Sequence, residues 1–350
     1  MKNVSELDTN FKINTAIDKG DIKFYNIDTP PFKLYGVFRE NGKYRRMPES
    51  VAKAVSSGVF ALHTNTAGGR VRFKTDSPYI AIYAKMSGIG KMPHFALTGS
   101  AGFDMYSENG GYRHIKTFAP PFDIKDGYES LADFGFSHLR EITVNFPLYS
   151  GVDELYIGVS EAARIYEPEP YKLQKPMVFY GSSITQGGCA SRPGSCYEGI
   201  ISRRFHSDYI NLGFSGNALA EEEMAHYIKG LDMSAFIYDY DHNAPDNEHL
   251  LKTHERMFRI IREANPELPV IIMSRPKYHL AKGELQRLAI IKATYDNAKK
   301  SGDKNVYLLD GRALMAQTED EGTVDTLHPT DLGFASMAKA LGDVLEELNI

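Results

Sequence analysis

The sequence predicts a two-part protein: an all-β sandwich followed by an α/β domain with a parallel sheet. The chain has 350 residues, which is more than one typical domain. Its N-terminal half alternates apolar and polar residues with a period of two, whereas its C-terminal half alternates short apolar runs with helical patterns. Three prolines within residues 167–176 hold that segment extended. We therefore expect a sandwich in residues 1–166, a linker in 167–176 and the α/β domain in 177–350.

The strand pattern of the N-terminal half runs from about Val59 to Val159. Clear examples are Val71–Thr75, Tyr79–Ala84 and Ile142–Phe146. Glycine-rich turns separate the strands, and no segment of this half carries a convincing helical pattern. Short strands joined by such turns are typical of antiparallel sandwiches, so we expect a jelly-roll-like domain without helices.

The C-terminal half alternates strands and helices. The predicted strands are Met177–Tyr180, Tyr209–Gly213, Ala235–Tyr240, Val270–Met273 and Val306–Leu309. The predicted helices are Ser195–Phe205, with Ser195 as its N-cap, Ala218–Leu231, Asn247–Ala264, Glu284–Lys300 and Thr330–Leu348. Such alternation implies a parallel sheet with helices on both faces, whose ligands bind beyond the carboxyl ends of the strands.

Composition excludes several classes of protein. The net charge is −5, from 40 Lys and Arg against 45 Asp and Glu, so we expect no nucleic-acid partner. No apolar run is long enough for a bilayer, and the N-terminus has no secretory pattern, so we expect a cytoplasmic protein without membrane contact. The two cysteines, Cys189 and Cys196, are expected to be reduced thiols, although a loop disulfide stays open if the protein is exported.

The first two strands of the α/β domain end in loops that expose polar groups. In the first loop, Gly181-Ser182-Ser183 forms a tight strand-to-helix turn that presents a hydroxyl and backbone N–H groups. Its alternative is a phosphate-binding loop, although the Walker pattern is absent. In the second loop, Gly216 can bring its backbone N–H close to a substrate oxygen. The alternative is that Gly216 is an ordinary turn glycine.

Two later loops add the remaining groups. After the third strand, Asn243 can donate its amide to an oxyanion. The carboxylates and His242 beside it suggest a metal site, but their spacing matches no metal motif. Near the C-terminus, Asp325 and His328 have the spacing of the orienting pair of a Ser-His-Asp triad. The alternative is a capped helix start in which His328 is incidental.

Together these loops resemble the four sequence blocks of the SGNH, or GDSL-type, hydrolases. The matching positions are Ser183, Gly216, Asn243, Asp325 and His328. The resemblance covers residues 177–350 and implies a flavodoxin-like, three-layer domain. It looks closest to the branch with a leading β-sandwich, because Gly151–Gly158 resembles the end of that domain. Two departures stand out: Ser182 replaces the usual Asp before the nucleophile, and the third block reads Asp-His-Asn.

The resemblance implies a serine esterase without cofactor or metal. Ser183 would be the nucleophile, His328 the base and Asp325 its orienting partner, with Ser183, Gly216 and Asn243 as the oxyanion hole. The expected substrate is a small-molecule or oligosaccharide ester, most of all an acetyl ester of a carbohydrate. An acyltransferase with the same triad is the first alternative, and an inactive carbohydrate-binding or scaffold protein is the second.

Other residues complete the sequence-based expectations. Arg192 and Arg275 are candidate substrate-binding residues, with loop fixation as the alternative for each. His249 and His254 lie on a charged helix and are expected to be solvated. The chain contains no Trp, so we expect the sandwich to help build the pocket or an oligomer interface rather than act as a separate sugar-binding module. Homo-oligomerisation is left open.

Overall fold

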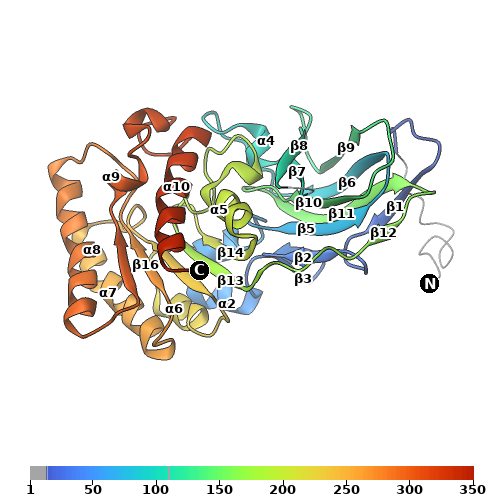
Figure 1. Cartoon of the computed structure of the whole chain (residues 1–350). Helices are drawn as coiled ribbons and strands as arrows, with labels where there is room; N and C mark the ends of the chain where they lie inside the picture. The colour runs from blue at the N-terminus through green and yellow to red at the C-terminus, as the bar shows by residue number, and fades with distance from the viewer. Residues whose placement is uncertain (1–12, 14, 109–110) are drawn as a thin grey trace.

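The structure is a computed structural model that describes residues 13, 15–108 and 111–350. Figure 1 shows its β-rich N-terminal half on the right and its α/β half on the left, with helices α7 and α8 at the far end. Within the described residues, no helix is both long enough and apolar enough to cross a membrane.

Two antiparallel sheets form the N-terminal half. One sheet has the strand order β1 (Ile22–Asn26), β11 (Gly151–Ser160), β6 (Tyr79–Ser87) and β9 (Gly127–Asp133). The other has the order β12 (Ile165–Tyr166), β5 (Arg70–Thr75), β10 (Arg140–Asn145), β7 (Phe103–Ser107) and β8 (Arg113–Phe118), with β2 (Lys33–Tyr35) also paired to β5. Strands β3 (Phe38–Glu40) and β4 (Lys43–Arg45) form a separate hairpin. Apolar side chains from both sheets share one core, which confirms the predicted sandwich.

The expectation that this half has no helices is wrong. It contains α2 (Glu49–Val55), α3 (Ser57–Leu62) and α4 (Leu97–Ser100). Ala52, Val55 and Val59 of α2 and α3 pack into the core of the C-terminal half. These short helices are stabilised by that tertiary packing, and so they leave only a weak periodic pattern in the sequence.

The C-terminal sheet is parallel, as predicted. Its strand order is β14 (Ser207–Gly213), β13 (Leu173–Gly181), β15 (Ala235–Asp239), β16 (Val270–Met273) and β17 (Val306–Leu309). The first strand, β13, therefore lies between the second and the third. This order places the loops after β13, β14 and β15 next to one another at the switch point, where open α/β sheets bind ligands.

Helices cover both faces of this sheet and give the predicted three layers. One face carries α5 (Tyr197–Phe205) and α10 (Asp331–Glu347), and the other carries α6 (Glu222–Ile228), α7 (Asn247–Ala264) and α8 (Lys282–Lys300). The short helix α9 (Gly311–Leu314) and the 3₁₀ turns η1 (Pro193–Ser195) and η2 (Glu319–Gly322) lie in the connections.

Three local predictions are corrected by the structure. Ser195 does not cap α5, because η1 occupies that position and Cys196 precedes the helix. Helix α6 is shorter at both ends than the predicted Ala218–Leu231. His254 is fully buried rather than solvated: it stacks on Tyr238 and hydrogen-bonds Thr294 over 2.8 Å.

Buried arginine side chains connect the two halves. Arg46, which follows β4, donates to the carbonyl oxygens of Asn211 and Gly213 at the end of β14, over 3.2 and 2.6 Å. Its guanidinium also lies over the ring of Phe214, 4.6 Å from the centroid. Arg70 of β5 pairs with Asp208 of β14. Because burying an unpaired charge is costly, these contacts hold the halves in one arrangement.

Candidate active site

Three side chains from two distant loops form a hydrogen-bonded row at the carboxyl edge of the parallel sheet. Ser183 lies in the turn after β13, and its Oγ is 3.0 Å from Nε2 of His328. The other ring nitrogen of His328, Nδ1, is 2.8 Å from Oδ2 of Asp325. A hydroxyl, an imidazole and a carboxylate in this order have the geometry of an activated serine nucleophile.

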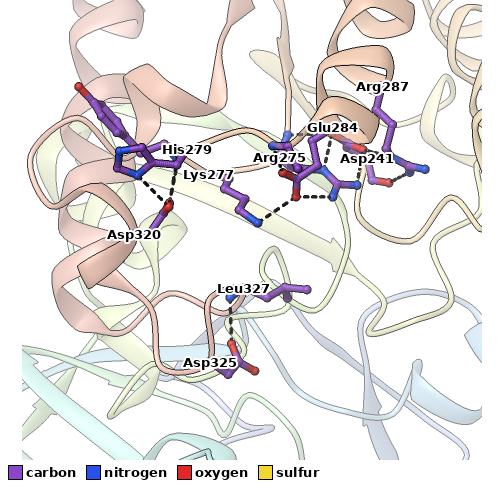
Figure 2. A network of polar contacts seen from close by, with 11 residues as sticks. Asp241, Arg275, Lys277, His279, Glu284, Arg287, Asp320, Asp325 and Leu327 are labelled. Atoms are coloured by element: carbon purple, nitrogen blue, oxygen red, sulfur yellow. Dashed lines mark hydrogen bonds and ion pairs between the residues drawn. The ribbon is translucent and has the colours of Figure 1, made fainter.

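Asp325 is fixed by more than the imidazole. Its Oδ1 accepts hydrogen bonds from the backbone N–H groups of Leu327 and His328, over 3.1 and 2.7 Å. Figure 2 shows the contact with Leu327 in the loop before α10. Burial acts to raise the pKa of Asp325, but the hydrogen bonds from His328 and Leu327 outweigh burial and lower it. The carboxylate is therefore ionised and aimed at His328 Nδ1.

The structure distinguishes the two neighbouring serines. Ser183 Oγ faces His328, whereas Ser182 Oγ accepts a hydrogen bond from the backbone N–H of Ile184 over 3.2 Å. Ser182 is 1% exposed and thus lies inside the turn. The serine at the usual Asp position therefore supports the turn, and Ser183 is the hydroxyl available to an acyl group.

The three candidate oxyanion donors lie in the neighbouring turns after β13, β14 and β15. Within the described part of the chain, the backbone N–H groups of Ser183 and Gly216 donate no hydrogen bond. Gly216 has φ +68°, a left-handed conformation that favours glycine, and a side chain there would meet open space. Asn243 donates one amide hydrogen to the carbonyl of Phe214 over 2.8 Å, which places its amide beside the Gly216 loop.

Two residues of the sandwich reach this site, and sequence reasoning missed both. The hydroxyl of Tyr149 donates to the carbonyl of Ser183 over 3.0 Å, next to the N–H of Gly188, which donates to the same oxygen over 2.7 Å. The ring of His94 lies 5.5 Å from that of His328, measured between centroids. No motif contains either residue, so no sequence signal could have placed them here.

The structure places Arg192 in a contact between the two halves. Its side chain lies 3.7 Å from Asp104 of β7 and 3.8 Å from Asp331 of α10. Asp104, whose pKa is raised by burial, also accepts the N–H of Gly194 over 2.8 Å. These contacts fix the loop that follows the nucleophile turn.

Arg275 lies in a second ion-pair cluster, shown in Figure 2. It bonds both carboxylate oxygens of Asp241, over 3.2 and 3.0 Å, and Oε1 of Glu284 over 3.3 Å. Arg287 also pairs with Asp241, over 2.7 Å. Burial acts to raise the pKa of Asp241, but the arginines outweigh it and hold the pKa far below its usual value. Asp241 is thus neutralised by arginines rather than free to bind a metal.

His242 and the two cysteines complete the surroundings. Burial lowers the pKa of His242 to about 3, so its imidazole is neutral beside Asn243. Cys189 and Cys196 are both buried and both free thiols. Burial, together with the charge of Asp325, raises the pKa of Cys189 to about 12, which makes the thiol a poor nucleophile.

Comparisons with known proteins match both halves of the chain. Residues 174–346 match the GDSL-like lipase/acylhydrolase family, and residues 22–165 match the N-terminal region of SGNH-hydrolase-type esterases. None of the curated proteins matches the sequence.

Solved structures resemble the chain over nearly its whole length. A protein of Bacteroides ovatus ATCC 8483 described as a GDSL-like lipase has a TM-score of 0.85 at 28% identity, over 94% of this chain and 98% of its own. The salicylyl-acyltransferase SsfX3 of a tetracycline biosynthetic pathway has a TM-score of 0.76 at 18% identity, over 95% and 99%. An acetyl xylan esterase of the rumen bacterium Butyrivibrio proteoclasticus has a TM-score of 0.59 at 13% identity, over 94% and 98%.

These matches confirm the resemblance seen in the sequence. The two family regions leave only a short stretch of chain between them, and they coincide with the sandwich and the parallel-sheet half of the structure. The chain therefore belongs to the GDSL-like lipase/acylhydrolase family, and it is an SGNH-type esterase with the N-terminal domain of that type.

Proposed function

We propose that the protein is a serine esterase that hydrolyses short-chain acyl esters, above all acetyl esters of a carbohydrate. The observation that carries the proposal is the hydrogen-bonded row from Ser183 Oγ through His328 to Asp325. A serine hydroxyl is a weak nucleophile at neutral pH unless a base takes its proton. His328 Nε2 lies within reach of that proton, and Asp325 orients the ring.

The proposed reaction has two halves. Ser183 Oγ attacks the acyl carbon while His328 Nε2 takes its proton, and the carbonyl oxygen becomes an oxyanion held by the N–H groups of Ser183 and Gly216 and the amide of Asn243. When this intermediate collapses, His328 returns the proton to the leaving alcohol and an acyl-serine remains. Water, deprotonated by His328, then releases the acid and restores Ser183.

A shallow, open groove lined by His242 and Ala244, the two neighbours of Asn243, is our candidate for the site that holds a sugar as the alcohol. The groove has a volume of about 930 Å³ and lies between the loop after β15 and the start of α8. Its lining includes seven polar or charged residues, namely His242, Asp246, Asn247, Glu248, Arg275, Glu284 and Arg287. Such a wall suits a substrate with many hydroxyl groups better than a long acyl chain, which needs apolar lining. Among the residues that the structure describes, no Phe or Tyr lines it, so a sugar would be held by hydrogen bonds rather than by ring stacking.

Contributions from both halves also support the proposal. We propose that the domains of residues 1–166 and 177–350 act as one unit, because Tyr149 bonds the nucleophile turn and Arg46 bonds the strand that leads to Gly216. The acetyl xylan esterase with the same overall fold makes acetylated carbohydrate the first substrate class to test.

Acetate release from a panel of acetylated oligosaccharides, with an aryl acetate and an aryl butyrate as references, tests the proposal. Ser183→Ala should lower kcat by roughly 10⁴- to 10⁶-fold. Ser182→Ala is the matched control and should lower kcat by about tenfold at most, since it removes one hydrogen bond within the turn and its hydroxyl does not face His328. Substantial turnover by Ser183→Ala would overturn the triad. A clear preference for butyrate would instead overturn the acetyl-carbohydrate assignment and leave the triad intact.

Acyl transfer is the alternative that uses the same side chains. In that reaction a sugar or small-molecule alcohol takes the acyl group from Ser183 in place of water. The structural likeness to the salicylyl-acyltransferase over nearly the whole chain is the reason to test acyl transfer as well. Product analysis with and without an acceptor alcohol separates the two reactions. A serine-reactive fluorophosphonate that labels the wild type but not Ser183→Ala would also argue against an inactive scaffold.

A further inference from the structure

We propose that His94, Cys189 and His328 form a site for Zn²⁺, and that the bound ion blocks the catalytic base. One ligand atom from each residue lies within 4.8 Å of the other two. The inhibitory consequence rests on the proposed function, whereas binding itself does not. The site differs from the Asp-His segment after β15, where arginines neutralise Asp241.

The three residues have the ligand chemistry that Zn²⁺ prefers. Two imidazoles and one thiolate are borderline-soft donors, and they occur together in tetrahedral zinc sites. Zinc binds such atoms at about 2.0–2.3 Å, so the bound donors lie roughly 3.3–3.7 Å apart. The distances between the three ligand atoms, which are up to 4.8 Å, must shorten by about 1 Å for zinc to bind all three. His94 can make this movement because its side chain is exposed.

An independent feature also fits a zinc ligand at His328. Ligating histidines usually donate their second ring nitrogen to a carboxylate, which fixes the tautomer and the ring orientation. His328 Nδ1 already bonds Asp325 over 2.8 Å, so Nε2, which faces Ser183, is the nitrogen left for an ion. His94 approaches His328 from the sandwich, and the centroids of the two rings are 5.5 Å apart.

Zinc binding would prevent His328 from acting as the catalytic base. When zinc coordinates Cys189, the thiol proton leaves to solvent and the ion holds the thiolate. Coordination of His328 Nε2 uses the lone pair that accepts the Ser183 proton, and it breaks the 3.0 Å contact between the two residues. Mg²⁺ and Ca²⁺ prefer oxygen ligands and should neither bind here nor inhibit.

Cobalt substitution tests binding without any need for activity. The full chain, stripped with a chelator and dialysed, is titrated with Co²⁺ while absorption is recorded. Thiolate ligation should produce a sulfur-to-cobalt charge-transfer band in the near ultraviolet, and Zn²⁺ should displace it. Cys189→Ser should abolish the band, and Cys196→Ser, at the other buried thiol of the same loop, should retain it. His94→Gln should weaken metal affinity by about tenfold or more.

Several results would overturn the proposal. These are an absent band in the wild type, a band that survives Cys189→Ser, or an unchanged affinity in His94→Gln. Thermal unfolding of each variant confirms that it is folded before it is titrated.

A second measurement separates this inference from the proposed function. Ser183→Ala should still bind cobalt, because Ser183 is not one of the three ligands. In the wild type, Zn²⁺ should inhibit ester hydrolysis reversibly, and His94→Gln should need about tenfold more zinc for the same inhibition. Cobalt binding with undiminished hydrolysis would refute the inhibitory role, whereas an active Ser183→Ala would refute the proposed function and leave the metal result standing.

Discussion

The hydroxyl of Tyr149 in the sandwich donates a hydrogen bond of 3.0 Å to the carbonyl of Ser183 in the α/β domain. The same carbonyl accepts the N–H of Gly188 over 2.7 Å. Tyr149 is 8% exposed, and its ring packs nearly perpendicular to that of Phe95, so its hydroxyl is held in position by packing. The N-terminal half thus bonds directly to the backbone of the proposed nucleophile.

Tyr149→Phe should lower kcat while the fold survives. The variant removes one of the two hydrogen bonds to the Ser183 carbonyl, and such a bond contributes about 0.5–1.5 kcal/mol to stability. We expect kcat to fall by about two- to tenfold, the equivalent of about 0.4–1.4 kcal/mol in barrier height. Tyr128→Phe is the matched control, since Tyr128 bonds the carbonyl of Phe118 inside the sandwich. Equal kcat losses in both variants would mean that the effect is general destabilisation.

Asn243→Ala should remove one oxyanion donor. Loss of a single donor typically lowers kcat by roughly 10²- to 10³-fold, because the charge develops only in the transition state. KM should change much less. Asn297→Ala, which breaks a contact with Glu255 away from the site, serves as the control. If KM rises and kcat stays constant, Asn243 binds substrate and does not stabilise the oxyanion.

Asp325→Asn should impair the base through its tautomer. The asparagine oxygen can keep the N–H bonds of Leu327 and His328, so its amide hydrogens then face His328 Nδ1. The ring must accept there and carry its proton on Nε2, where it cannot take the Ser183 proton. We expect kcat to fall by roughly 10⁴-fold.

Asp320→Asn is a matched control for Asp325→Asn. Asp320 pairs with His279 over 3.1 Å, another Asp–His contact in the region shown in Figure 2. Near-normal turnover is expected from this control. A loss as large as that of Asp325→Asn would show that the region tolerates no change of charge.

Asp239→Asn should change how stability depends on pH. Asp239 is 1% exposed at the end of β15, and burial raises its pKa from 3.8 to about 8. Between these two values the folded protein holds a proton that the unfolded chain releases. The wild type therefore loses stability as pH rises through this window, by up to about 1.4 kcal/mol per pH unit.

Urea unfolding at pH 5 and pH 8 measures this effect. The variant lacks the ionisable proton, so its free energy of unfolding should improve relative to the wild type as the pH rises. Asp232→Asn removes a surface charge and controls for the change in net charge. If the difference between the variant and the wild type is the same at both pH values, Asp239 does not hold the proton in the folded state.

Much of the α/β half could be predicted from sequence alone. The strand Val270–Met273 and the helix Asn247–Ala264 match their predicted bounds, because a continuous apolar run and a capped amphipathic pattern are local signals. His254 was misjudged on that same helix. It lies on the buried face, where Tyr238 and Thr294 provide partners that helical periodicity does not reveal.

Local sequence patterns also predicted the candidate residues of the site, but they did not show which of these residues are in contact. The order of strands and turns brought Ser183, Gly216, Asn243, Asp325 and His328 to one edge of a parallel sheet, since the carboxyl ends of parallel strands share an edge. The choice between Ser182 and Ser183 needed the turn itself, because only its backbone path decides which hydroxyl faces His328.

The tertiary structure alone decided the role of the N-terminal half. His94 and Tyr149 lie in loops without a motif, and they reach the site because buried arginines and the helices α2 and α3 hold the two halves together. Sequence determined the chemistry, since hydroxyl, imidazole, carboxylate and amide occur in recognisable local patterns. The fold determined which groups surround that chemistry, because contacts between residues far apart in the chain depend on packing that no local pattern records.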